Sequence, residues 1–273
     1  MHLCRIGGIP LGLHWSFLVL LVYLSWEGWS VAEWHGLIWI LGFTVSVFTC
    51  VVLHELGHAV TARRFGIKVP RILLLPIGGM AEFNRIPRNS RQEILIALAG
   101  PAVNALLAIG LWAVGVRFSS DWQVIEFPLT LGELGRHLVL MNVVMGIFNL
   151  LPIFPMDGGR VFRAVLALKF PYLRATFFAS LVGKLLATLG IGTMLLALGS
   201  PHWLGAALFA FIFLAGEMEY RAVRNRDEID QHWQETWERF ERQTAQSRSS
   251  FDVSAPVEPD DPEKNSLRSN SQL

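Results

Sequence analysis

Charged residues are scarce in this chain. Asp, Glu, Lys and Arg together make up 16% of its 273 residues, whereas a soluble domain carries about 25%. The shortage excludes an ordinary cytosolic globule and a disordered protein. Neither sign of charge dominates, because the formal net charge is +1. The sequence therefore also lacks the basic balance of a nucleic-acid-binding protein, and we expect no nucleic-acid partner.

Cysteine is almost absent as well. Cys4 and Cys50 are the two cysteines of the chain, and their wide separation argues against a disulfide framework. Apolar residues are abundant instead, because 52% of the chain is hydrophobic. The composition therefore predicts a polytopic membrane protein with a polar tail.

Apolar segments of about the length that crosses a bilayer recur through the first part of the chain. A spanning helix needs about 20 apolar residues, and the candidate segments are 13–26, 36–62, 92–116, 137–157, 176–199 and 202–216. Isolated strands cannot span lipid, and the alternating pattern of a membrane barrel is missing. We therefore expect an α-helical polytopic domain of about six transmembrane helices over residues 1–216.

The rest of the chain is polar and divides into two regions. Residues 217–246 are charged, but Trp233, Trp237 and Phe240 recur at helical spacing. This pattern predicts a cytoplasmic amphipathic helix that lies on the membrane or on a partner, or a solvated helix that packs weakly on the bundle. Residues 247–273 are rich in Ser, Pro, Asp and Glu, which predicts disorder.

The basic residues indicate how the bundle is oriented. Most of them follow the second, fourth and sixth segments, and Arg117 and Arg136 fall on the opposite side. The positive-inside rule therefore places both chain ends in the cytoplasm, in a multi-pass integral protein of a cell membrane. The residues on the basic side are Arg63, Arg64, Lys68, Arg71, Arg85, Arg88, Arg91, Arg160, Arg163, Lys169, Arg174, Arg221, Arg224 and Arg226.

The clearest chemical motif is the pentapeptide His54-Glu55-Leu56-Gly57-His58. Residues four apart lie on one face of a helix, so the two imidazoles can bind one zinc ion. Glu55 lies beside them, where a carboxylate can accept a proton from water. Ionisable groups inside a membrane helix are costly and indicate function. The alternative is that the histidines cap the helix end at the cytoplasmic headgroups.

Asp157 is the best candidate for a third metal ligand. It follows Pro152 and Pro155 and precedes Gly158-Gly159, so the end of the fourth segment is expected to be unwound or kinked. Such a break would let Asp157 turn toward a metal on the second segment. The alternative is an N-cap aspartate that opens a short helix at 158–168.

Two asparagines in apolar segments need hydrogen-bond partners. Asn149 could stabilise a developing oxyanion or join two helices. Asn104 follows Gly100-Pro101, and its alternatives are helix packing, which is favoured, or a hydrogen bond to a ligand or to the second segment.

Residues 72–83 are apolar but too short to span a bilayer. Pro76 and Gly78-Gly79 break a helix, which favours a short strand pair or a re-entrant loop. An exposed strand edge there could pair with an extended substrate. The alternative is a hairpin at the membrane surface that only connects helices. Gly78, Gly79, Asn104 and Pro152 are the candidate substrate-contacting residues.

These motifs together resemble the site-2 protease family of intramembrane zinc metalloproteases. The similarity rests on His54-Glu55-x-x-His58 and on Asn149-x-x-Pro152-x-x-Pro155-x-Asp157-Gly158. Further matching elements are Gly100-Pro101-x-x-Asn104, Pro76-Ile77-Gly78-Gly79 and Gly8-Ile9-Pro10-Leu11 with His14 and Ser16. The outline is closest to the minimal six-helix subgroup of prokaryotic cell membranes, here without cystathionine-β-synthase-type or PDZ domains.

The resemblance implies a zinc ion held by His54, His58 and Asp157, with Glu55 as the general base and single-pass membrane proteins in the bilayer as substrates. Asn149 is then the candidate for oxyanion stabilisation. An alternative function is a metal transporter or a metal-binding membrane protein without hydrolytic activity, and a further alternative is a structural subunit with a degenerate site. The sequence leaves the oligomeric state open.

Overall fold

The structure is a computed structural model that describes residues 2–76, 78–82, 84, 89–116, 130–197 and 202–253. The chain divides into two compact parts, Met1–Val223 and Arg224–Leu273, and each is described by itself. Three basic residues used to orient the bundle, Arg85, Arg88 and Arg117, lie outside the described residues. So do residues 254–273, which make up most of the tail predicted to be disordered.

The first helix, α1, runs from Trp15 to Arg64 and contains both the first and the second predicted segments. His14 caps its start, because the imidazole accepts a hydrogen bond from the Ser16 backbone N–H. The helical backbone is interrupted at Ala32 and Glu33, whose φ and ψ angles are not helical. This interruption divides α1 into two arms.

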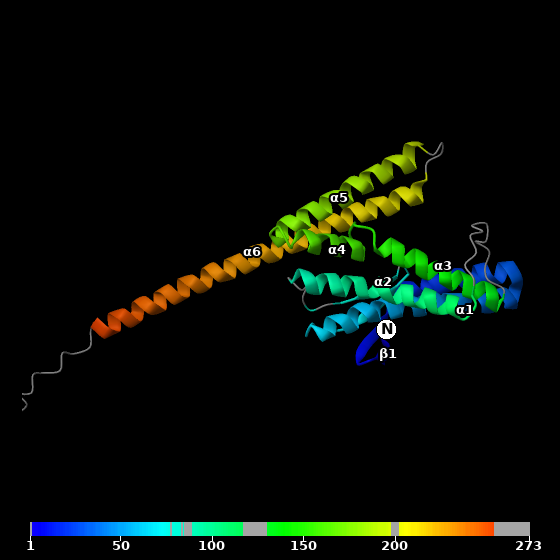
Figure 1. Cartoon of the computed structure of the whole chain (residues 1–273), viewed down its shortest axis with the longest axis horizontal. Helices are drawn as coiled ribbons and strands as arrows, with labels where there is room; N and C mark the ends of the chain where they lie inside the picture. Colours follow the sequence, from blue (N-terminus) through cyan, green and yellow to red (C-terminus); the bar gives the residue numbers. More distant parts are fainter. Residues whose placement is uncertain are drawn as a thin grey trace, which may run out of the picture. The chain divides into compact units, whose positions relative to one another are not determined.

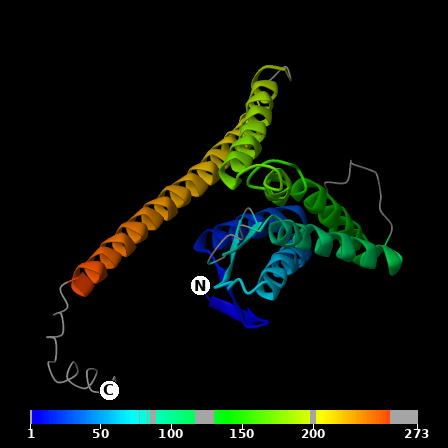
Figure 2. The same cartoon turned by 60° about the vertical axis from the view of Figure 1, so that its left-hand side comes forward.

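The two arms of α1 lie antiparallel against each other (Figure 2). Phe17 and Phe48 meet edge to face with their ring centroids 4.5 Å apart. Close to the interruption, a Cβ atom added to Gly36 would lie 2.1 Å from the carbonyl oxygen of Gly28. The absence of side chains at these two glycines therefore lets the arms approach at the turn.

A small sheet covers one end of the α1 hairpin. Its strands are β1 (His2–Ile6), β2 (Ile9–Leu13), β3 (Ile72–Leu75) and β4 (Gly78–Ala81), in the order β1-β2-β3-β4. The strand pair expected within 72–83 is confirmed as an antiparallel hairpin. The sequence did not predict β1 or β2, nor the parallel pairing that places Leu11 opposite Ile72.

The alternating burial of the strands explains where the sheet lies. Ile9, Leu11 and Leu13 face inward from β2, and Ile72 and Leu74 do so from β3. These residues form one apolar core with the second arm of α1 and with Ile96 of the next helix. Burial of this shared face holds the β3–β4 hairpin beside the helix that carries the HExxH motif.

Helix α2 (Ser90–Ala113) lies next to α1, as Figure 1 shows. α2 contacts α1, α3 (Leu131–Asn149) and the short α4 (Asp157–Leu166), and α4 in turn contacts α5 (Tyr172–Gly192). A short π-helical stretch, Thr193–Ala197, extends α5. The last helix, α6, begins at Trp203 and ends at Val253.

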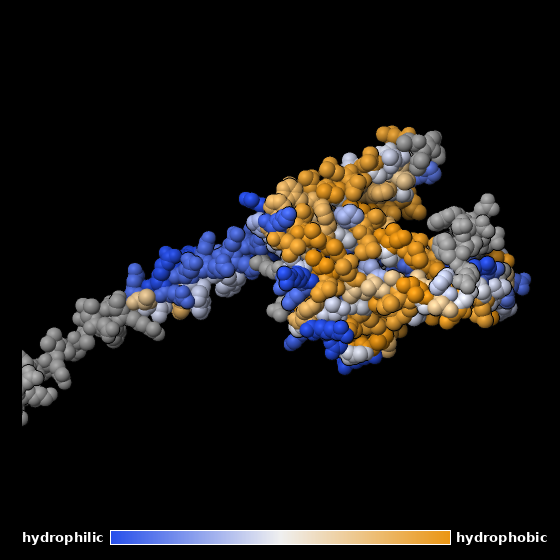
Figure 3. All heavy atoms as spheres, viewed as in Figure 1, coloured by the Kyte–Doolittle hydropathy of each residue, from blue (hydrophilic) through white to orange (hydrophobic). Residues whose placement is uncertain are grey.

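Within the described residues, 5 helices are long and apolar enough to cross a membrane: α1, α2, α3, α5 with its π-helical extension, and α6. The two arms of α1, taken separately, account for the remaining predicted segment. Apolar side chains cover much of the visible face of these helices in Figure 3. Large side chains such as Leu106 and Leu189 are exposed, as lipid contact requires.

The second part, from Arg224 onward, is helical as far as Val253 and hydrophilic. Ile229, Trp233, Trp237 and Phe240 are exposed along it. The amphipathic helix at 217–246 and the boundary at residue 217 stay predictions.

Gly36→Ala should destabilise the α1 hairpin, because the added methyl group has no room beside the Gly28 carbonyl. Overpacking of this kind costs about 1–3 kcal/mol. Gly42→Ala on the same helix is the matched control, since nothing lies within 4 Å of the place that its Cβ atom would take. Thermal unfolding in detergent should show a lower Tm for Gly36→Ala alone. Equal Tm values for both variants would contradict the packing at the turn.

Candidate metal centre

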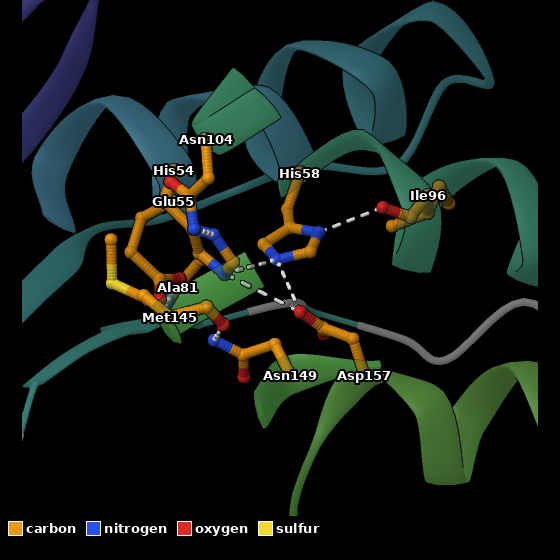
Figure 4. A network of polar contacts seen from close by, with 9 residues as sticks. All are labelled: His54, Glu55, His58, Ala81, Ile96, Asn104, Met145, Asn149 and Asp157. Atoms are coloured by element: carbon orange, nitrogen blue, oxygen red, sulfur yellow. Dashed lines mark hydrogen bonds and ion pairs between the residues drawn. The ribbon is translucent and has the colours of Figure 1, made fainter. Parts of the chain in front are cut away.

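The second arm of α1 brings two histidines together one helical turn apart. His54 and His58 are both buried, with 4% of each residue exposed. Their Nε2 atoms point toward one another and lie 3.1 Å apart (Figure 4). The i and i+4 spacing therefore gives the shared face that the sequence predicts.

A break between two helices brings Asp157 to the same point. α3 ends at Asn149, the chain from 150 to 156 is not helical, and α4 begins at Asp157. A Cβ atom on Gly158 would lie 2.2 Å from the carbonyl oxygen of Leu150, so the chain folds back tightly where only glycine fits. Met156 occupies the N-cap position and makes no side-chain cap bond. The alternative of an N-cap aspartate is therefore wrong.

Three ligand atoms converge as a result. Asp157 Oδ2 lies 3.3 Å from His54 Nε2 and 3.1 Å from His58 Nε2. A tetrahedral zinc ion with bonds of about 2.0–2.1 Å holds its ligand atoms roughly 3.3–3.4 Å apart. Asp157 Oδ2 is also buried without a hydrogen-bond partner. The spacing and the unsatisfied oxygen both fit a divalent cation such as zinc.

Hydrogen bonds from α2 orient the two imidazoles. His58 Nδ1 lies 2.7 Å from the carbonyl oxygen of Ile96, to which it donates. That bond leaves the lone pair of His58 Nε2 directed at the centre.

His54 Nδ1 lies 3.1 Å from the side-chain nitrogen of Asn104, while Asn104 Oδ1 is buried without a partner. Rotation of this amide by half a turn places Oδ1 where it accepts from Nδ1–H. The oxygen is then satisfied and His54 Nε2 faces the centre. Asn104 therefore contacts a predicted metal ligand, which favours a positioning role over direct substrate contact.

Gly100 provides the space for both rings. A Cβ atom at this position would lie 2.2 Å from His58 Nε2 and 2.7 Å from His54 Nε2. Glu93, Ile96, Gly100 and Asn104 are all buried on one face of α2. This face meets both histidines.

Glu55 contacts the β3–β4 hairpin. Its Oε2 atom accepts a hydrogen bond of 3.0 Å from the backbone N–H of Ala81. A Cβ atom on Gly79 would lie 2.6 Å from Glu55 Cγ, so glycine lets β4 lie against this side chain. Gly78 has a φ of +141°, which favours glycine, and nothing lies within 4 Å of its Cβ position.

Two further candidates lie at the end of α3. The side-chain nitrogen of Asn149 donates to the carbonyl oxygen of Met145 at 3.0 Å, a bond drawn in Figure 4. Pro152 is exposed in the non-helical segment. Asn149 as an oxyanion donor and Pro152 as a substrate contact stay predictions.

One buried pair was not predicted from the sequence, Glu93 of α2 and Arg163 of α4. Arg163 was counted with the basic residues outside the membrane, but its side chain is 0% exposed and paired with Glu93, which is also 0% exposed. Burial alone would lower the pKa of Arg163, and the neighbouring charge of Glu93 outweighs it, so this pKa is raised. Glu93 within an apolar segment was the available signal.

Comparison with known proteins identifies relatives that are zinc metalloproteases. The model of peptidase family M50 matches residues 42–134 and 128–190. The zinc metalloprotease MJ0392 of Methanocaldococcus jannaschii is 38% identical over 223 residues, which are 82% of this chain and 61% of that protein. Rip3 of Mycobacterium tuberculosis is 30% identical over 82% of this chain and 57% of its own length.

A solved structure is also similar, the site-2 protease from Methanocaldococcus jannaschii. The TM-score is 0.56 at 36% sequence identity, over 81% of this chain and 94% of that one. The chain belongs to peptidase family M50, the site-2 protease family. It spans about three fifths of the length of the curated relatives described above, 61% and 57%.

Gly100→Ala should reduce zinc retention, because the methyl group would collide with both imidazoles. Gly110→Ala on the same helix is the control, since its Cβ position is free. The zinc-to-protein ratio of each purified variant, measured by elemental analysis, should fall for Gly100→Ala alone. A full complement of zinc in Gly100→Ala would mean that the rings do not lie against α2.

Proposed function

We propose that this protein is an intramembrane zinc metalloprotease that hydrolyses peptide bonds in or near the transmembrane segments of single-pass membrane proteins. The observation that carries the proposal is the convergence of His54, His58 and Asp157 within 4.8 Å of one another, buried in a membrane helix bundle. The family relationship supports the same chemistry.

His54, His58 and Asp157 would hold the zinc. When bound, zinc acts as a Lewis acid that polarises the scissile carbonyl and makes water a stronger nucleophile. Glu55 is the proposed general base, whose carboxylate would accept the proton of the attacking water and later deliver it to the leaving amine. Asn149 is the candidate donor to the developing oxyanion, for which its amide would have to leave the Met145 carbonyl.

The β3–β4 hairpin is the candidate binding surface for the substrate backbone. A substrate helix hides its carbonyls in i→i−4 hydrogen bonds and must unwind before attack. β4 is an edge strand of the sheet, and the N–H of Ala81 on it points at Glu55. An unwound segment could pair with this edge beside the general base. Gly78 and Gly79, both half-buried, belong to this strand.

The proposed orientation places the metal centre near the cytoplasmic side. Arg63 and Arg64 are exposed at the end of α1 that carries the histidines. Trp26, Trp29 and Trp34 are exposed around the opposite turn of the hairpin, where an interfacial aromatic belt is expected. Both termini would then face the cytoplasm of a prokaryotic cell.

Glu55→Gln should abolish cleavage while zinc remains bound, because the amide keeps its shape but cannot accept the proton. Loss of a general base lowers rates roughly 100- to 10,000-fold. Membranes from cells with either protein can be compared by proteomics, with Glu228→Gln on the exposed helix as the control. Single-span fragments should accumulate in Glu55→Gln membranes alone. Full activity of Glu55→Gln would refute the general-base assignment.

Asp157→Ala should lower the zinc-to-protein ratio, because two imidazoles alone make a weaker site. An unchanged ratio would remove Asp157 from the ligand set.

The same preparations separate the protease from a metal transporter, which would move zinc across liposome membranes independently of Glu55. Zinc flux into liposomes without any substrate cleavage would favour the transporter.

A further inference from the structure

A buried charge cluster lies on α4 beyond the metal centre. Arg163 donates from Nε to Glu93 Oε1 at 3.0 Å, and its Nη2 atom contacts the same oxygen. Its Nη1 atom donates to Glu219 Oε1 of α6 at 2.5 Å. The guanidinium carbon also lies 5.1 Å from the ring centroids of Phe154 and Tyr172. One side chain therefore joins α4 to α2, α5 and α6.

The helix that Arg163 holds is the helix that carries Asp157. α4 is 10 residues long, and its first turn has no side-chain cap. Asp157 and Arg163 are six residues apart, which corresponds to about 9 Å along a helix axis. Because a helix this short moves as a rigid body, a shift at Arg163 displaces the carboxylate at its other end.

Glu93, the α2 residue that binds Arg163, lies on the same face of α2 as the residues that contact the histidines. Glu93 shares the buried face of α2 with Ile96, which accepts from His58, and with Asn104, which contacts His54. Glu93 binds α4 three residues before Ile96 binds α1. One helix face therefore sets the positions of both ligand-bearing elements relative to each other.

The Arg163–Glu93 ion pair is better suited to fixing the position of α4 than to stabilising the fold. Two well-packed apolar residues often stabilise a fold as well as a buried ion pair does. The directional bonds of a guanidinium fix both translation and rotation of the helix that carries it. Glu93 Oε2 stays buried without a hydrogen-bond partner, so the cluster is not arranged to satisfy every polar atom.

We propose that Arg163 is a positioning residue for the metal centre, which through its buried ion pair with Glu93 sets Asp157 opposite His54 and His58. The inference rests on the proposed function, because it takes these three side chains as the zinc ligands. Arg163 itself touches neither metal nor substrate.

A double-mutant cycle with Asp157 tests the proposal. Zinc affinity of the full chain in detergent is measured by competition with a chromophoric chelator for wild type, Arg163→Met, Asp157→Asn and the double variant. Arg163→Met should weaken zinc binding by roughly 10- to 100-fold. In the Asp157→Asn background, Arg163→Met should change the zinc affinity little, because the carboxylate through which Arg163 acts on zinc has already been removed. An equal loss in both backgrounds, or no loss in either, would overturn the proposal.

Two further variants separate positioning from general destabilisation. Lys184→Met removes the ion pair with Glu217 that links α5 to α6, so it should lower thermal stability without changing zinc affinity. Arg163→Lys keeps the charge but loses the fork of hydrogen bonds, and it should show an intermediate loss of affinity with the same dependence on Asp157. This variant replaces Arg163→Met if the latter fails to fold. A Lys184→Met protein that loses as much zinc affinity would overturn the proposal.

The absorption spectrum of the cobalt-substituted protein gives an independent readout. Displacement of the Asp157 carboxylate changes the coordination of the ion, so Arg163→Met should move the visible bands toward those of Asp157→Asn. Bands identical to wild type would contradict the positioning role. A wild-type protein that binds neither zinc nor cobalt would instead refute the proposed function.

Discussion

Helix α2 meets the elements that carry the three ligand side chains along one buried face. The Ile96 carbonyl orients His58, Gly100 makes room for both rings, and Asn104 contacts His54. On the same face, Glu93 holds α4 through Arg163. These contacts recur at three- and four-residue intervals, so the geometry of a single helix relates all parts of the centre. The metal centre therefore depends on how α1 and α4 dock on α2.

The cost of burying polar groups explains why this docking must be specific. A buried polar atom without a partner costs about 1–3 kcal/mol, and four such atoms occur among the described residues. Two of them, Asp157 Oδ2 and Asn104 Oδ1, belong to the metal centre, and each can gain a partner there. A bound cation would satisfy Asp157 Oδ2, and rotation of the amide satisfies Asn104 Oδ1. The four atoms are Glu93 Oε2, Asn104 Oδ1, Asn142 Oδ1 and Asp157 Oδ2.

Local patterns in the sequence predict much of the fold and of the candidate centre. The i and i+4 histidines need only helical periodicity, and the prolines and glycines around Asp157 reveal the break that lets it turn inward. The strand pair within 72–83 follows from short apolar runs separated by Pro76 and glycines. Each of these features depends on neighbours within a few residues.

Contacts between distant segments could not be predicted in the same way. The parallel pairing of Leu11 with Ile72 joins segments about sixty residues apart, and β1 and β2 make sense only beside β3. Nothing in the sequence around Arg163 distinguishes it from an exposed loop cation. Its role becomes visible only when the fold brings it to Glu93, 70 residues away. A backbone carbonyl such as that of Ile96 carries no sequence signal, because every residue has one.

X-ray absorption at the zinc edge of the zinc-loaded full chain tests the central claim most directly. The scattering pattern reports the type, number and distance of the atoms bound to zinc. The structure predicts two imidazole nitrogens at about 2.0–2.1 Å and a carboxylate oxygen at about 2.0–2.2 Å. Asp157→Asn should change the oxygen contribution and leave both imidazoles. A spectrum with fewer than two imidazoles would contradict the convergence of His54 and His58 on one ion.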